Sequence, residues 1–238
     1  MKPNTGEFIT FGAAHIAALS LILVVALILV FLARFEKAKE LIKPVRYTLA
    51  AVLIGNELIY IVGLLAKGLW TYKWGLPLQL CDLAIFAVVF SLIRHNQFIW
   101  EIAYFWGLGG TLQALLTPDL RVGFPDYIFF KFFLTHGCII IGVFLLAAGI
   151  QRPIFSRSVR RIFIVTNVYA GFIALFNWLF DANYLYLCRK PTQPSALDFF
   201  GPWPVYLLGL ELMLIVSLMI YYSPYYFLAQ KRGVGQPL

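Results

Sequence analysis

Long apolar segments separated by short polar or charged stretches dominate the hydrophobic pattern of this chain. Each segment is continuously apolar over about 20 residues, the length that a helix needs to cross the hydrocarbon core of a bilayer. None alternates as a lipid-facing barrel strand does, which excludes a transmembrane β-barrel. The pattern predicts an all-α, polytopic membrane helix bundle, a single domain over residues 1–238. Its seven transmembrane helices are expected at residues 11–33, 47–66, 76–93, 99–117, 128–150, 162–180 and 203–222.

Composition supports the same fold class. Hydrophobic residues make up 61% of the chain and charged residues 13%, with a mean hydropathy of +0.83. Soluble domains carry about twice that share of charged residues, so a soluble enzyme domain is excluded. The segments between the apolar runs are too short for an independent domain, so any chemistry must be built inside the bundle. We expect a multi-pass protein of the cell membrane, in a bacterium the plasma membrane.

The formal net charge of +8 is not a signal for nucleic acid, because the basic residues gather in short clusters at the ends of the apolar runs. Such clusters usually set the orientation of a membrane protein. Residues 34–46 and 152–161 hold nine of the 19. Lys and Arg favour the cytoplasmic side, so the sequence predicts an N-terminus outside and a cytoplasmic C-terminus.

Cysteine content excludes a disulfide framework. Cys81, Cys138 and Cys188 are few and far apart, and no Cys-x-x-Cys or His/Cys cluster is present. Metal sites built from such ligands need them at close spacing. We therefore expect no metal and no cofactor.

Ionisable and amide side chains lie inside several of the apolar runs. They are costly in a bilayer, so each is a candidate for function, although a partner within the bundle makes it structural. Most fall in the outer halves of the expected helices, which predicts a polar cavity open toward the outer leaflet. The residues concerned are His15, Asn56, Glu57, Gln79, Cys81, Asp82, Gln113, His136 and Glu211.

Cys81 and His136 lie at compatible depths in their helices. A thiol beside an imidazole is the minimal pair for covalent acyl transfer, because the base removes the thiol proton and the thiolate attacks a carbonyl. Cys81 is also expected in the first turns of a helix, where the macrodipole favours a thiolate. The structural alternatives are a cysteine that packs as a small hydrophobe and a histidine that joins two helices.

Four segments in order resemble one family. They are Leu76-Pro-Leu-Gln-Leu-Cys-Asp, Gly107-Leu-Gly-Gly-Thr-Leu-Gln with Pro118-Asp119, Phe124-Pro-Asp-Tyr through Thr135-His-Gly, and Asn183-Tyr-Leu-Tyr-Leu through Gly201-Pro-Trp-Pro. The set is similar to the YwaF family of integral membrane proteins, whose animal member is transmembrane protein 164. The resemblance implies seven spans and, for the animal branch, phospholipid acyl transfer with a cysteine nucleophile and a histidine base. These two roles fall on Cys81 and His136, whereas Gln79 stands where many relatives have a histidine.

The sequence leads to hypotheses of function in three classes. The leading hypothesis is a membrane-embedded acyltransferase that remodels phospholipids through a Cys81 thioester with His136 as base. Its expected partner is a membrane phospholipid, and the sequence leaves the oligomeric state open. The residues expected to orient or bind the substrate are Gln79, Asp82, Gln113, Glu57, Glu211 and Asn183.

The alternative is a transporter or binding protein for a small polar ligand or protons, which would use the intramembrane Glu and His residues. A third hypothesis is a scaffold subunit that packs against other membrane proteins through Gly109 and Gly110. The loop at residues 183–204 is rich in Pro and aromatic residues, and we expect it to fold back over the cavity as a lid.

Overall fold

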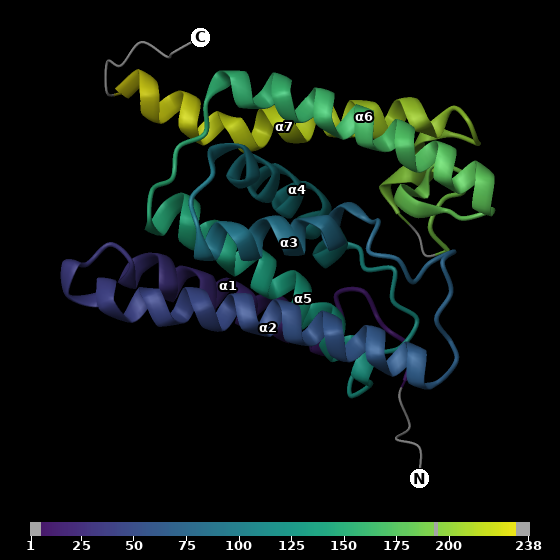
Figure 1. Ribbon diagram of the computed structural model, residues 1–238, viewed down its shortest axis with the longest axis horizontal. Coiled ribbons are helices and arrows are strands. Elements are labelled where there is room, and N and C mark those ends of the chain that lie inside the picture. The colour runs from purple at the N-terminus through teal and green to yellow at the C-terminus, as the bar shows by residue number, and fades with distance from the viewer. Residues whose placement is uncertain (1–5, 193–194, 232–238) are drawn as a thin grey trace. The chain divides into compact units, whose positions relative to one another are not determined.

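The computed structural model describes residues 6–192 and 195–231, and this part of the chain is helical apart from its connections. Short helical turns lie at Glu36–Ala38, Tyr184–Tyr186 and Ala196–Phe200, and a π-helical turn at Leu145–Gly149 continues α5. Between the described residues, the only β pairing is an isolated bridge from Glu7 to Val122. The long helices in Figure 1 are α1 (Ala13–Leu32), α2 (Lys39–Ala66), α3 (Leu80–Ile93), α4 (Gln97–Leu116), α5 (Tyr127–Phe144), α6 (Ser156–Phe180) and α7 (Tyr206–Lys231).

Five helical segments are long and apolar enough to cross a membrane, and α3 is a shorter apolar helix. The expectation of an all-α protein of the membrane is therefore confirmed at this level. The five segments are Ala13–Leu32, Glu40–Ala66, Tyr127–Gly149, Ser156–Phe180 and Tyr206–Gln230.

Several helices begin or end away from the residues expected from hydropathy. The helix α2 starts at Lys39 instead of residue 47, and α6 starts at Ser156 instead of residue 162. The extra turns carry charged residues, which a helix accommodates outside the hydrocarbon layer although they end an apolar run. In contrast, α3 starts four residues later than expected, because the backbone N–H of Leu76 donates to the Tyr184 hydroxyl (2.9 Å) instead of entering a helix.

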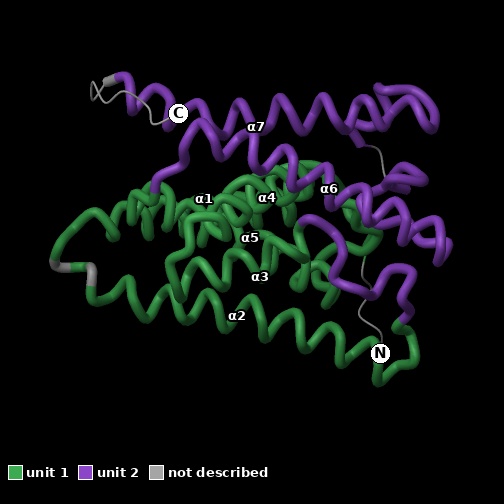
Figure 2. Tube along the Cα trace, turned by 45° about the horizontal axis from the view of Figure 1, so that its top comes forward, with its two compact units in different colours: residues 1–70, 81–152 green, residues 71–80, 153–238 purple. Residues whose placement is uncertain are grey.

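Contacts between Cα atoms group the chain into two compact units, coloured separately in Figure 2. The first comprises residues 1–70 and 81–152, and the second comprises residues 71–80 and 153–238. Both candidate catalytic residues, Cys81 and His136, belong to the first unit.

The helix α5 is the centre of the first unit, because α1, α2 and α4 all pack against it (Figure 1). Glycines on α5 and α4 let the neighbouring helices come close. A Cβ atom at Gly137 would lie 2.8 Å from Cγ1 of Ile22 on α1, and one at Gly107 would lie 3.0 Å from Cγ2 of Val143. His136 is thus held on the most buried of the five candidate spans.

We expect Gly137→Ala to destabilise the first unit by about 1–3 kcal/mol, because the new methyl group meets Ile22 in a packed helix contact. The matched control is Gly55→Ala on α2, where a Cβ meets nothing within 4 Å. This control should be neutral or stabilising, since alanine is the better helix former. Thermal unfolding in detergent compares the two, and equal stability would contradict the close approach of α1 and α5.

Arginine side chains hold the other end of α3. The Arg46 Nε atom donates to the carbonyl of Leu92 (2.7 Å), and Arg152 donates to the carbonyl of Arg94 (3.3 Å). Burial and, second, the charge of Arg46 lower the pKa of Arg152 to about 10, which still leaves it a cation at neutral pH. These bonds satisfy carbonyls that a helix end leaves without a helical partner.

In the second unit, α6 packs against α7. Tyr184, in the loop that follows α6, connects this loop to residues 71–80. Asn177 and Tyr184 exchange two hydrogen bonds of 2.9 Å, and the Tyr184 hydroxyl donates to the carbonyl of Tyr72 (2.9 Å). Lys73 also pairs with Asp181 (2.7 Å), and its hydrogen bond and charge hold the pKa of that exposed carboxyl below its usual value. The part of the 183–204 loop that carries Tyr184 is therefore anchored to the segment that leads into α3.

Candidate functional site

His136 lies on α5 and is held in one orientation by its own helix. Its Nδ1 atom is 2.8 Å from the carbonyl oxygen of Phe132, and the Phe132 ring stacks on the imidazole with centroids 4.1 Å apart. A carbonyl can only accept, so Nδ1 carries the proton of the neutral ring and Nε2 keeps a lone pair. This is the tautomer that a general base needs.

Cys81 is the second residue of α3, and Asp82 follows it in the first turn. The thiol of Cys81 points toward the carboxylate of Asp82, with 4.0 Å between Sγ and Oδ1. This position beside the free N–H groups of a helix start agrees with the expectation from the sequence. Cys81 is half-buried, and it forms no disulfide.

Lys131, one turn before Thr135 and His136 on α5, places a positive charge in the same region. Its Nζ atom is 3.1 Å from Oε2 of Glu57 on α2 and 4.3 Å from the centre of the Tyr60 ring. The two charged side chains are 17% and 11% exposed, so little water reaches the pair. Buried charges persist only when they are paired in this way.

Asn56 joins α2 to α5 beside this ion pair. Its Nδ2 atom donates to the Thr135 hydroxyl (2.7 Å) and to the carbonyl of Lys131 (3.1 Å). An amide that bridges two membrane helices fixes their register, because slippage would leave its donors unpaired. Asn56 therefore sets the height of Lys131 and His136 relative to Glu57.

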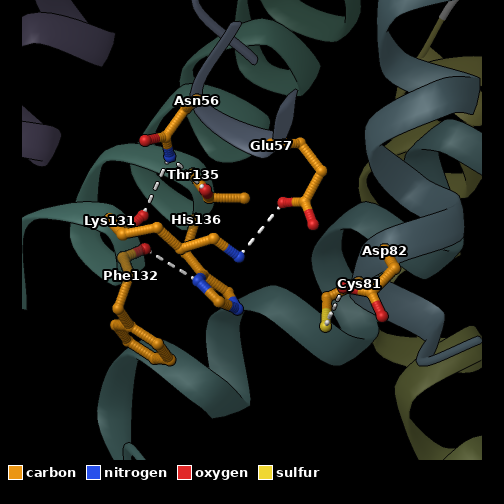
Figure 3. Close-up of polar contacts among 8 residues, drawn as sticks. All are labelled: Asn56, Glu57, Cys81, Asp82, Lys131, Phe132, Thr135 and His136. Atoms are coloured by element: carbon orange, nitrogen blue, oxygen red, sulfur yellow. Dashed lines mark hydrogen bonds and ion pairs between the residues drawn. The ribbon is translucent and has the colours of Figure 1, made fainter. Parts of the chain in front are cut away.

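Figure 3 shows how these side chains lie. The imidazole of His136 and the ammonium of Lys131 project from α5 into the space that the Cys81 thiol also faces, and Glu57 reaches toward Lys131 from α2. Cys81, Asp82, Glu57 and His136 thus lie in one region of the first unit. No hydrogen bond joins Cys81 to His136 among the described residues. Catalytic hydrogen bonds are often longer without substrate, so the arrangement is compatible with a thiol and base that meet on substrate binding.

We expect Glu57→Gln to destabilise the protein by about 3 kcal/mol, since it leaves the ammonium of Lys131 buried without a counter-charge. The double variant Glu57→Leu with Lys131→Met removes both charges and should recover most of this loss. Thermal unfolding in detergent measures both. A single variant as stable as wild type, or a double variant less stable than the single, would contradict a buried ion pair.

The remaining residues named from the sequence lie elsewhere. Gln113 is half-buried on α4, and within the described part of the chain its side chain makes no hydrogen bond or ion pair to this cluster. In the second unit, Gln79 accepts from the N–H of Leu185 (2.9 Å), and Glu211 accepts from Asn167 (3.0 Å). Asn183 accepts from two backbone N–H groups of its own loop, at Cys188 and Arg189 (both 3.0 Å). Gln79 and Asn183 therefore support the loop conformation.

His15 is fully engaged in packing α1 onto α4. Its Nδ1 accepts from the N–H of Phe11 (2.9 Å), and its Nε2 donates to the carbonyl of Leu115 (2.7 Å). With both ring nitrogens bonded and 1% of its surface exposed, it is a structural histidine.

The sequence analysis missed Lys131 and Thr135. Lys131 is the fifth residue of α5, so the sequence pattern indicates a basic residue at the end of a membrane span. The available signal was its spacing, because residues four apart on a helix share a face, which places Lys131 beside Thr135, the neighbour of His136. Within the described ranges, no three His, Cys, Asp or Glu side chains gather closely enough to hold a metal ion.

Comparison with known proteins supplies a family. A protein from Treponema pallidum (strain Nichols), described only as uncharacterized, is 24% identical over 222 residues, which cover 93% of this chain and 92% of that protein. No solved structure matches the chain. The model of the TMEM164 family matches residues 10–222, nearly the whole chain and the whole of the site described above. The chain therefore belongs to the TMEM164 family.

Proposed function

We propose that this protein is a membrane-embedded acyltransferase that remodels phospholipids through a thioester on Cys81. One observation carries the proposal: the bond from His136 to the Phe132 carbonyl fixes the tautomer whose Nε2 is free to accept a proton. The resemblance of the Leu76–Asp82 and Phe124–Gly137 segments to the family's cysteine and histidine segments supports the same assignment.

The first half-reaction loads the enzyme. Nε2 of His136 takes the Cys81 proton, and the thiolate attacks the carbonyl carbon of a phospholipid ester. A carbon–sulfur bond forms and the ester carbon–oxygen bond breaks. The lysophospholipid leaves with the proton that the imidazolium returns to its alkoxide oxygen.

The second half-reaction transfers the acyl group from Cys81 to an acceptor. His136 removes the proton of an acceptor hydroxyl, such as that of another lysophospholipid. The oxygen attacks the thioester carbonyl, a new ester forms and the carbon–sulfur bond breaks, which restores the Cys81 thiol after protonation by His136. The same residue serves as base and acid in both halves.

Lys131 has the position and charge to stabilise the oxyanion that forms in each half-reaction. An ammonium offers three N–H donors, and Glu57 engages it at 3.1 Å without using all of them. Asn56 fixes the Lys131 backbone, so the charge is held in place before reaction. Asp82 orients the Cys81 thiol in the resting enzyme.

The setting of the reaction is the cell membrane. We propose that seven helices cross it, with the N-terminus outside and the C-terminus in the cytoplasm, and that the phospholipid enters between helices from the lipid phase. A similar protein in Treponema pallidum supports a bacterial plasma membrane. The reaction needs no cofactor.

A defined lipid mixture tests the activity. Purified protein in nanodiscs receives a phospholipid with one acyl chain length and a lysophospholipid acceptor with an isotope-labelled head group, and mass spectrometry follows the products. The proposal predicts the labelled head group with the donor's chain. Release of free fatty acid without transfer would make the protein a hydrolase, and unchanged lipids with folded protein would contradict the proposal.

A transporter is the second candidate, and the buried Lys131–Glu57 pair inside two candidate spans is the observation that favours it. Proton flux into proteoliposomes separates the two functions. Flux that depends on Glu57 and is unaffected by Cys81→Ser supports transport, whereas flux that is absent supports the enzyme.

A further inference from the structure

A groove of about 460 Å³ lies between α6 and α7 in the second unit. Its wall is almost entirely apolar, and Ser156, Arg160 and Tyr222 stand at one end of it. Residues that line it include Ser156, Arg160, Phe163, Ile215, Leu218 and Tyr222.

The two ends of the groove lie at different expected depths in a membrane. Ser156 and Arg160 stand at the start of α6, and Tyr222 stands near the end of α7, where two further tyrosines follow. Tyrosine and arginine are typical of the membrane–water interface, where lipid phosphates lie. Phe163, Ile215 and Leu218 lie deeper in helices that are long and apolar enough to span the bilayer. The groove therefore offers an apolar wall at acyl-chain height, and Ser156, Arg160 and Tyr222 stand beside its end at phosphate height.

Positive charge gathers at this end of the groove. Arg157, Arg160 and Arg161 occupy the first two turns of α6, and no acidic residue stands in its first turn. The start of a helix is already its positive end, so these arginines add to the field instead of balancing it. Arg157 lies over the ring of Phe155 (5.0 Å), and among the described residues Arg160 makes no ion pair. An anion at this end would pair with Arg160 and would lie at the positive end of the helix.

We propose that this groove binds an anionic membrane phospholipid. One acyl chain lies along Phe163, Ile215 and Leu218, and the phosphate lies against Arg160 and Arg157, within reach of the Ser156 and Tyr222 hydroxyls. Basic pockets between membrane helices attract anionic head groups. A zwitterionic lipid has no net charge and is attracted less strongly by the arginines. The site uses neither Cys81 nor His136, so it stands independently of the acyltransferase.

Native mass spectrometry of the detergent-purified full chain tests whether binding depends on the charge of the lipid head group. Titrations with phosphatidylglycerol and with phosphatidylcholine of the same chains should show tighter binding of phosphatidylglycerol. Each arginine beside an anionic lipid is worth roughly a fivefold change in binding. The double variant Arg157→Gln, Arg160→Gln should therefore bind phosphatidylglycerol roughly 25-fold more weakly and phosphatidylcholine as before.

A matched variant removes the same charge elsewhere. Arg34 and Lys43 are exposed near the ends of α1 and α2, so Arg34→Gln with Lys43→Gln should leave binding of both lipids unchanged. An equal loss of phosphatidylglycerol binding in this control would show that the net charge of the protein causes the effect, and it would overturn the proposal. Equal binding of the two lipids by wild type, or full retention by the α6 double variant, would overturn it as well.

Filling the groove with a larger side chain tests whether the acyl chain lies along its apolar wall. Met219 lines the groove and is 57% exposed, so Met219→Trp should occupy it and lower binding of both lipids. The neighbouring Ile220, 58% exposed and outside the groove, gives the control Ile220→Trp, which should bind as wild type does. Lipid binding unchanged by Met219→Trp, or a change in oligomeric state in its place, would show that the groove is not a lipid site.

Discussion

Replacing Cys81 with serine should lower the rate of acyl transfer by more than about a thousandfold and leave the fold intact. A serine hydroxyl is nearly the same size as the thiol but is a far weaker nucleophile near neutral pH, so the thioester cannot form. The measurement is the initial rate of labelled product formation in nanodiscs, with the unfolding temperature measured in parallel.

Cys188→Ser is the matched control for this variant, since Cys188 lies in the loop of the second unit and is also a half-buried free thiol. It should keep the wild-type rate. Transfer at the wild-type rate by Cys81→Ser would remove Cys81 from the mechanism and favour the transporter.

The substitution His136→Gln should lower kcat by about a hundredfold to ten-thousandfold, because the thiol and then the acceptor hydroxyl lose their general base. The KM for the phospholipid should change little, since His136 is not needed to hold the lipid chain. Raising the pH should recover part of the lost rate in the variant, as hydroxide then ionises the thiol directly.

His95→Gln provides the comparison, because His95 is an exposed histidine in the connection between α3 and α4. It should leave kcat unchanged. A His136→Gln variant that loses affinity without losing kcat, or shows no recovery at high pH, would make His136 a substrate-binding or structural residue.

Hydropathy was sufficient to place the long helices along the chain but not their ends. The apolar core of α2 is evident from the sequence, whereas its first eight residues include four charged residues and Pro44 and were expected to form a loop. The late start of α3 depends on the bond between Leu76 and Tyr184, residues 108 positions apart, which no local pattern reveals. The division into two units also follows from contacts that are distant in the sequence.

The candidate site shows the same limit. Cys81 and His136 were accessible to sequence analysis because a thiol and an imidazole inside apolar runs are chemically unusual. Lys131 was not, because a lysine near the end of a span usually reaches the interface, and only the positions of Glu57 and Tyr60 show that it turns inward. Gln79 and Asn183 were expected to orient substrate, and their loop hydrogen bonds appear only in the folded structure.

The most direct test of the central claim is the intact mass of the purified protein after incubation with phospholipid and no acceptor. The mechanism predicts a mass increase of one acyl group on wild type, mapped to the peptide that carries Cys81 and removed by hydroxylamine. The Cys81→Ser variant should stay at its unmodified mass. An unmodified wild type, or an acyl group on Cys138 or Cys188 instead, would contradict a thioester mechanism at Cys81.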